Sequence, residues 1–162
     1  VVRDLLKITD LEVEQPRNPH PKRPVSGLDW PKEEVSGTRL WGLLADKYGS
    51  AESIFKSVFL LNHCPLMLFS GERATNITPD KIAGPTTRKL LERCDEHLQE
   101  VVEIMEIERV IGVGRYSEKR AKNALLNTGI EVTTCWHPSP ASPLANRNGG
   151  EDWRVNVSSV LP

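Results

Sequence analysis

A strand, a helix and a second strand follow one another in the last third of the sequence, and this order constrains the fold more than any other feature. Residues 109–115, RVIGVGR, form a short apolar run that ends in a glycine turn. Residues 117–129 have helical spacing, with Ser117 as the expected N-cap and Gly129 as the expected end. Residues 130–136, IEVTTCW, then have strand character. Strands joined by a helix pair in parallel with a right-handed crossover, so the sequence predicts an α/β fold.

Three further segments are regular. Within residues 33–50 apolar side chains recur at helical spacing, with Ser36 as a possible N-cap and Gly49 as the stop. Residues 85–105 form the clearest amphipathic helix. Residues 54–61, IFKSVFLL, have the β-rich apolar character of a buried strand. These segments add two helices and one strand to the predicted layers.

The remaining regions and the composition point to one globular domain. Residues 1–8 have the pattern of a helix end, and residues 14–31 form a proline-rich loop with no period. The chain has 162 residues, of which 38% are hydrophobic and 27% charged, which is ordinary for a globular protein. We therefore expect a single domain over residues 1–162.

Ligands of parallel sheets bind at the carboxyl ends of the strands, and three loops follow predicted strands. They begin near Asn62, Gly114 and His137, so we expect these loops to converge on one crevice. Because His137 precedes a proline, its backbone is held extended and its ring has little freedom to retreat. The structural alternative is a histidine that caps the strand end. Asn62 has its own alternative as a turn residue, but its planar amide can pair with the edge of a nucleobase.

Charge and motif counts weaken several other classes. The net charge is −1, so any anionic partner must be held by a local arrangement rather than by a global basic field. Gly112 and Gly114 resemble a truncated dinucleotide fingerprint, but Ser117 stands where the third glycine belongs. No run reaches the roughly 18 apolar residues of a membrane span.

Cysteine and histidine spacing gives no metal site. Three cysteines lack CxxC spacing and lie in apolar settings, which favours reduced core thiols and an intracellular location. Three histidines have no Cys or His at metal-ligand spacing, so we expect no zinc. These residues are Cys64, Cys94, Cys135, His20, His63 and His97.

Five blocks of the sequence resemble the single-strand-selective monofunctional uracil-DNA glycosylases. They read HPKRPVSGL, EVSGTRLWG, LLNHCPL, VIGVGR and HPSPASPLAN, the last followed by a tryptophan, and the resemblance runs from Val1 to about Trp153. It implies a three-layer α/β sandwich around a short parallel sheet. It also implies a nuclear, monomeric DNA repair hydrolase that flips uracil or 5-hydroxymethyluracil out of single- or double-stranded DNA to start base excision repair, with no metal or cofactor.

The resemblance also implies roles for individual residues. Asn62 would bind the uracil edge, and His137 would face uracil O2 as negative charge develops on the leaving base. The loop after His137 would wedge into the duplex. The residues with implied DNA contacts are Pro138, Ser139, Pro140, Ala141, Asn146, Arg147 and Ser36.

The sequence departs from the family pattern in two places. Ala141 stands where the family carries arginine, and the stretch before Trp153 is longer. The family's Gly-Met-Asn-Pro-Gly-Pro-Phe block, which positions the attacking water, lies upstream of the segment that matches Val1. We therefore expect the bare chain to be poorly stable and to release no measurable uracil. We also expect unpartnered apolar side chains at Val58, Leu60, Val110 and Val113. Restoration of that block is expected to recover excision.

Two alternatives stay open: an inactive DNA-binding fragment of this family and an unrelated small-molecule-binding α/β domain.

Overall fold

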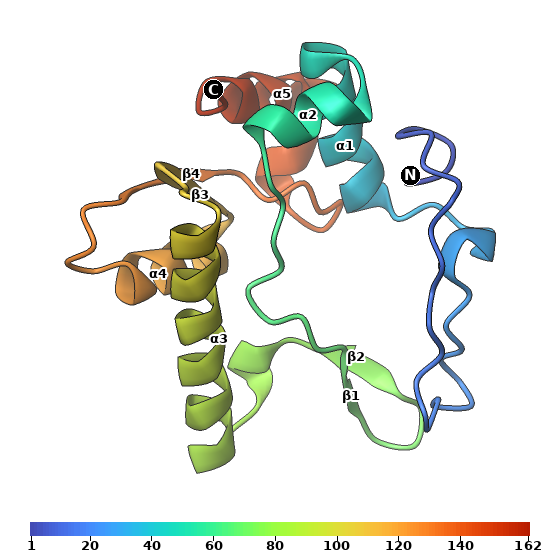
Figure 1. The fold of residues 1–162 in the computed structure, drawn as a ribbon. Coiled ribbons are helices and arrows are strands. Elements are labelled where there is room, and N and C mark those ends of the chain that lie inside the picture. Colours follow the sequence, from blue (N-terminus) through green and yellow to red (C-terminus); the bar gives the residue numbers. More distant parts are fainter. The chain divides into compact units, whose positions relative to one another are not determined.

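The computed structural model describes residues 1–162, except for the side chain of Asp80, and divides into two compact units (Figure 1). The first unit contains residues 1–60, 138–158 and 162. The second contains residues 61–137 and 159–161. One domain over the whole chain stays a prediction.

The second unit is built on a parallel pair of strands. Strand β3 (Arg109–Val113) pairs in parallel with β4 (Glu131–Cys135). Helix α4 (Arg115–Ala124) makes the crossover and packs on both strands, and helix α3 (Pro85–Ile104) packs against α4. The predicted strand–helix–strand unit and the long amphipathic helix are confirmed, and with them the α/β class.

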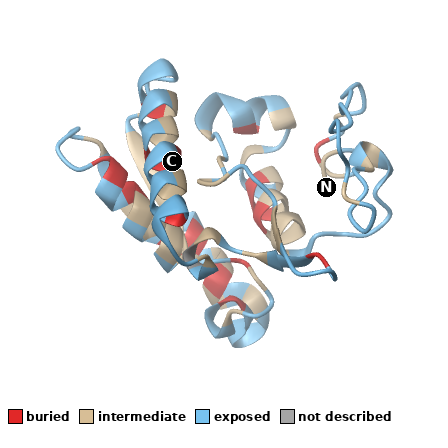
Figure 2. Ribbon diagram, turned by 90° about the horizontal axis from the view of Figure 1, so that it is seen from below, coloured by how far each residue is buried: buried red, intermediate tan, exposed pale blue. Residues whose placement is uncertain are grey.

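The core of the second unit lies where α3, α4 and the strands meet. Figure 2 shows the buried positions along the helices in red. At the centre are Val102, Ala124 and Leu125, surrounded by Leu98, Ile107, Val110, Ile130 and Val132. Burial of such apolar side chains stabilises a fold by roughly 25 cal/mol per Å² removed from water. This cluster fixes α3 and α4 against the sheet.

The predicted bounds of α4 were wrong at both ends. The helix begins at Arg115 with Gly114 as its N-cap, so Ser117 lies inside the helix and caps nothing. It ends at Ala124, and Gly129 comes only after an intervening turn. A glycine with φ of +85° can turn the chain directly from β3 into the helix, which removes the need for a side-chain cap.

The strand predicted over residues 54–61 was also wrong. Its first half belongs to helix α2 (Ala51–Ser57), because the Ser50 hydroxyl accepts a hydrogen bond from the Ser53 N–H at 3.2 Å and caps the helix. An ion pair of 2.8 Å between Lys56 and Glu52 adds support along the same helix. Residues 58–61 lie outside any strand.

Four apolar side chains were expected to lack neighbours. Leu60 is 39% exposed, in agreement with that expectation. Val58, Val110 and Val113 are instead partly buried.

A short antiparallel hairpin that the sequence did not predict lies between α2 and α3 in the chain. It is formed by β1 (Leu68–Ser70) and β2 (Thr75–Ile77).

The first unit contains α1 (Val35–Tyr48), α2 and α5 (Glu151–Ser158). Gly49 ends α1 with φ of +85°, as predicted. The N-cap is Glu34 rather than Ser36: the Glu34 carboxylate accepts hydrogen bonds from the backbone N–H groups of Ser36, at 3.0 Å, and Gly37. The fully buried side chains of this unit include Leu44, Ile54 and Val157.

The N-terminal residues form one hydrogen-bonded turn and no assigned helix. The Leu5 N–H donates to the Val1 carbonyl at 2.9 Å, and Leu6 is buried. The proline-rich loop is irregular, as predicted, apart from a short 3₁₀ turn at Gly27–Asp29. None of the described helices is long and apolar enough to cross a membrane.

All three cysteines are free thiols. Burial, with a smaller contribution from the Cys64 thiol, raises the pKa of Cys94 to about 11. Burial alone raises the pKa of Cys135 to about 11. Both groups therefore stay protonated at neutral pH and behave as small apolar side chains.

Candidate functional site

A cavity of about 280 Å³ opens at the carboxyl ends of β3 and β4 in the second unit. Its walls come from the turn before α3, from the β3–α4 junction and from His137 after β4. The lining residues are Thr78, Pro79, Val113, Gly114, Arg115, Tyr116, Ser117 and His137. The structure thus brings the Gly114 and His137 loops together, as expected for the ligand edge of a parallel sheet.

Gly114 and His137 are in close contact. The Gly114 N–H donates to the Cys135 carbonyl at 2.8 Å, which extends the strand pairing to the cavity mouth. A Cβ atom built on Gly114 would lie 3.0 Å from the His137 Cβ and 3.5 Å from its Cδ2. Since Gly114 also has φ of +85°, only glycine fits this position without strain. The His137 ring therefore rests against bare backbone.

Replacement of Gly114 by alanine is expected to disturb His137 directly. The added methyl would meet the histidine side chain, and the positive φ would cost about 1 kcal/mol or more. We expect a small loss of stability and a larger loss of any activity that depends on His137. Circular dichroism melts and an activity assay on the same preparation check this. Gly71→Ala, at a positive φ with open space around it, is the matched control. Equal losses of activity in the two variants would contradict the contact.

Gly112 has a packing role as well. A Cβ atom there would lie 2.5 Å from the backbone N and Cα of Glu118 in α4. The two glycines of the VIGVGR block thus serve close helix–strand packing and contact with His137. Both glycines therefore have packing roles that do not require a bound dinucleotide.

Asn62 lies in an irregular segment before β1 and is exposed. It is not among the residues that line the His137 cavity. Its role as a base-reading residue therefore stays a prediction. Its neighbour His63, by contrast, has a side chain only 8% exposed.

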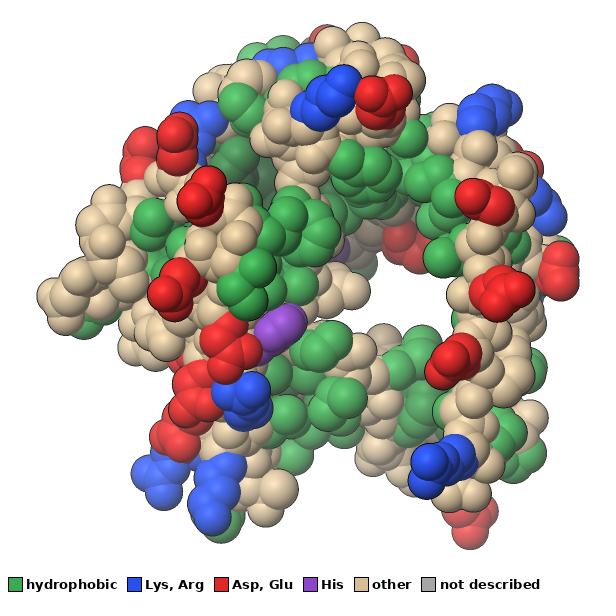
Figure 3. Space-filling view, viewed as in Figure 1, with side chains coloured by type: hydrophobic (Ala, Val, Ile, Leu, Met, Phe, Trp, Pro, Cys, Tyr) green, Lys and Arg blue, Asp and Glu red, His purple; other side chains and the backbone are tan. Residues whose placement is uncertain are grey.

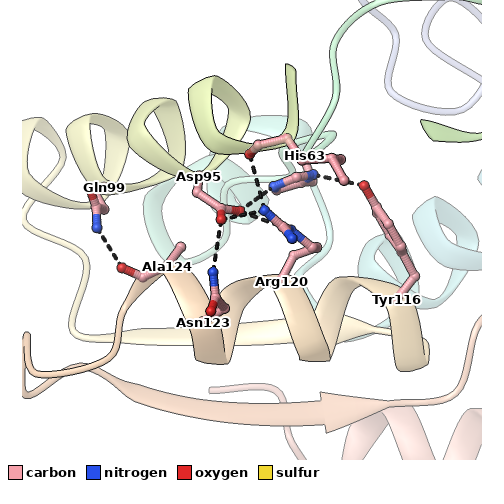
Figure 4. A network of polar contacts seen from close by, with 8 residues as sticks. His63, Asp95, Gln99, Tyr116, Arg120, Asn123 and Ala124 are labelled. Carbon is pink, nitrogen blue, oxygen red and sulfur yellow. Dashed lines mark hydrogen bonds and ion pairs between the residues drawn. The ribbon is translucent and has the colours of Figure 1, made fainter. Parts of the chain in front are cut away.

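A buried polar network, which sequence reasoning missed, extends from His63 across α3 to α4 (Figure 4). The Asp95 carboxylate on α3 accepts hydrogen bonds from Arg120 Nε at 3.0 Å and from Arg120 Nη2. Asn123 Nδ2 donates to the same carboxylate at 3.1 Å. His63 Nε2 lies 2.9 Å from Asp95 Oδ1, and its Nδ1 lies 3.1 Å from the Tyr116 hydroxyl. The network ends at Tyr116, a residue of the cavity wall.

One signal in the sequence could have revealed part of this network. Asp95 stands within the apolar stripe of α3, four residues after Leu91 and three before Leu98. A carboxylate on a buried helix face needs a cationic partner. Arg120 could have been suggested as that partner, with Asn123, three residues later on the same face of α4, as a further hydrogen-bond donor.

The segment expected to wedge into DNA, residues 138–147, belongs to the first unit and is held by Arg39 of α1. Arg39 Nη1 donates to the Pro138 carbonyl at 3.0 Å, and Nη2 donates to Asn146 Oδ1 at 3.0 Å. The Asn146 amide in turn donates to the Pro140 carbonyl at 2.8 Å. The amide of Asn146 thus orders this loop internally.

The other residues expected at DNA have diverse settings. The Ser139 hydroxyl accepts a hydrogen bond from the Ala141 N–H at 3.2 Å and tightens the loop. Arg147 is 60% exposed, with Nε 3.6 Å from Asp152 Oδ2. Ser36 lies partly buried in the first turn of α1. Acidic and basic side chains both occur on the face shown in Figure 3.

Comparison with known proteins shows which proteins the chain resembles. No family model matches the chain. A bovine protein named single-strand selective monofunctional uracil DNA glycosylase is 42% identical over 170 residues, which cover 100% of this chain and 60% of the bovine protein. The rat and mouse proteins of the same name are 42% and 40% identical over 149 residues, covering 91% of this chain and 53% of each relative.

The chain is similar over its whole length to these uracil-DNA glycosylases. The resemblance noted from five sequence blocks is thereby confirmed across its whole length. The chain spans between 53% and 60% of the length of these curated relatives. The aligned region includes the β3–α4 junction and the His137 loop, since the bovine match covers every residue.

Proposed function

We propose that the protein carrying this chain is a DNA glycosylase that hydrolyses the N-glycosidic bond of uracil in DNA. The observation that carries this proposal is the similarity of the entire chain to proteins named as uracil-DNA glycosylases. The cavity at the carboxyl ends of β3 and β4, with His137 against Gly114, supports it. We extend the proposal to 5-hydroxymethyluracil, and to single- and double-stranded DNA, on the family resemblance alone.

In the proposed reaction the target nucleotide leaves the base stack and its uracil enters a pocket. A water oxygen bonds to the sugar C1′ atom, the bond from C1′ to uracil N1 breaks, and uracil leaves with the bonding electron pair. Negative charge then develops on uracil O2. The proton lost by the water goes to solvent, and the uracil anion takes up a proton from solvent after it leaves. A donor fixed beside O2 lowers the barrier by about 3 kcal/mol, and His137 is the residue assigned to that place.

In the proposed complex, DNA makes two further kinds of contact with the protein. Asn62 pairs with the polar edge of uracil, so that cytosine meets mismatched donors. The stiff loop of residues 138–147 contacts the strand around the flipped nucleotide, with exposed Arg147 near phosphate. Ser36, Pro138, Ser139, Pro140, Ala141 and Asn146 complete the proposed contact set. We also propose that the protein acts as a monomer in the nucleus and uses water without a metal or cofactor.

The test is uracil release by the full-length protein from a labelled single-stranded oligonucleotide, compared with a duplex and with a cytosine strand. His137→Gln is expected to lower the rate of release by about 10²- to 10³-fold. His97→Gln makes the same change in α3, outside the lining of the cavity. It is the matched control and should retain the parent rate. Retention of the oligonucleotide without release would instead favour the inactive DNA-binding alternative. Neither release nor retention would favour the small-molecule-binding alternative.

A further inference from the structure

The ring of His63 is fixed on both sides. Its side chain is 8% exposed, and its two nitrogens lie 2.9 Å from Asp95 Oδ1 and 3.1 Å from the Tyr116 hydroxyl. The ring also meets the Tyr116 ring edge to face, with centroids 5.7 Å apart and planes at 77°. A ring bonded at both nitrogens and packed on one face cannot rotate without losing these contacts. The backbone at residue 63 is therefore anchored (Figure 4).

The surroundings of Asp95 determine which nitrogen of His63 carries the proton. Asp95 also receives hydrogen bonds from Arg120 and Asn123, so its carboxylate acts only as an acceptor. His63 Nε2 must then donate to Asp95. In the neutral imidazole Nδ1 is left as an acceptor, and the Tyr116 hydroxyl donates to it. Asp95 thus fixes both the tautomer and the ring orientation, as carboxylates do for histidines in metal sites.

Tyr116 connects this anchor to the cavity. It lies in the first turn of α4, directly after the Gly114–Arg115 pair that also lines the cavity of His137. On the other side, His63 follows Asn62 in the chain. The hydrogen bonds from α3 through His63 to α4 therefore tie the Asn62 segment to the wall that carries Gly114. All of these residues belong to the second unit.

We propose that His63 is a positioning residue that fixes the backbone at Asn62 relative to the cavity wall that carries Tyr116. His63 acts through Asn62 and does not contact the substrate. Asp95 sets its tautomer, and Tyr116 is its fixed point on the cavity wall. This inference rests on the proposed function, in which Asn62 reads the uracil edge.

A double-mutant cycle in the full-length protein tests the inference. His63→Leu removes both hydrogen bonds but keeps a side chain of moderate size. It is expected to lower kcat/KM for uracil release from single-stranded DNA by about 10²-fold, the scale of a misplacement of about 1 Å. In an Asn62→Ala background the same change is expected to have no further effect, because the residue it positions is gone. Tyr116→Phe keeps the ring contact and should give an intermediate loss. His97→Leu serves as the control and should keep the parent rate.

A second measurement separates this inference from the proposed function. Amide hydrogen exchange of residues 62–64 should become faster in His63→Leu, while exchange in α3 and α4 stays at the parent rate. If the parent releases uracil but the two substitutions are additive, or exchange is unchanged, the positioning role is wrong. If the parent releases no uracil but exchange rises as expected, the proposed function is wrong while the anchoring of Asn62 stands.

Discussion

Replacement of Asn62 by aspartate is expected to lower uracil release by about 10⁴-fold. The asparagine amide can donate a hydrogen bond to uracil O4 and accept one from uracil N3–H. Aspartate replaces the donor by a second acceptor, so uracil O4 would face a carboxylate oxygen. A site built to hydrogen-bond its substrate rejects such a mismatch because the polar groups are left unpaired.

The measurement is single-turnover uracil release from a single-stranded oligonucleotide by the full-length protein. Asn76→Asp is the matched control, because Asn76 is an exposed asparagine of β2 in the same unit. It makes the same chemical change and should leave the rate unchanged. A rate for Asn62→Asp within a few-fold of the parent would remove Asn62 from the base-binding role.

Replacement of Asp95 by alanine is expected to destabilise the protein by about 3–5 kcal/mol, the usual cost of removing one partner of a buried ion pair. The Arg120 side chain is 18% exposed and would lose its carboxylate, while His63 and Asn123 would each lose a hydrogen-bond partner. The apolar cluster of Val102, Ala124 and Leu125 would keep its packing, so we expect a folded but weakened protein.

Urea unfolding followed by circular dichroism checks this prediction. Glu96→Ala changes the next residue of α3, whose 2.9 Å ion pair with Arg93 is exposed. Exposed pairs contribute about 0–1 kcal/mol, so this control should unfold near the parent midpoint. Similar midpoints for the two variants would mean that the Asp95 network contributes no more than a surface pair.

Local patterns predicted the part of the fold that depends on neighbouring residues. The strand–helix–strand unit and α3 follow from periodicity that packing then preserves. The strand predicted over residues 54–61 was wrong because a serine cap and a Lys56–Glu52 ion pair favour a helix despite the β-rich composition. The predicted starts of two helices were also wrong. Glu34 is the N-cap of α1 and Gly114 is the N-cap of α4, in place of the expected serines.

The candidate site was only partly predictable for a different reason. His137 and Gly114 could be placed at one sheet edge because parallel topology dictates it. The network could not, since His63 lies 32 residues from Asp95 and 53 from Tyr116 along the chain. No periodicity links such distant positions. Arg39 was missed similarly, because its partners in the loop of residues 138–147 lie about a hundred residues away.

The interleaved division of the chain has a consequence for biosynthesis. The second unit is nearly continuous in sequence, because residues 61–137 form almost all of it. These residues leave the ribosome before residues 138–158, which belong to the first unit. Arg39 must wait for Pro138 and Asn146, 99 and 107 residues later, before its guanidinium finds a partner. Domains generally fold as units during synthesis, and contacts between distant residues form slowly. Residues 1–60 are therefore expected to reach their final structure later than residues 61–137, and their apolar side chains stay open to solvent until residues 138–158 have been synthesised.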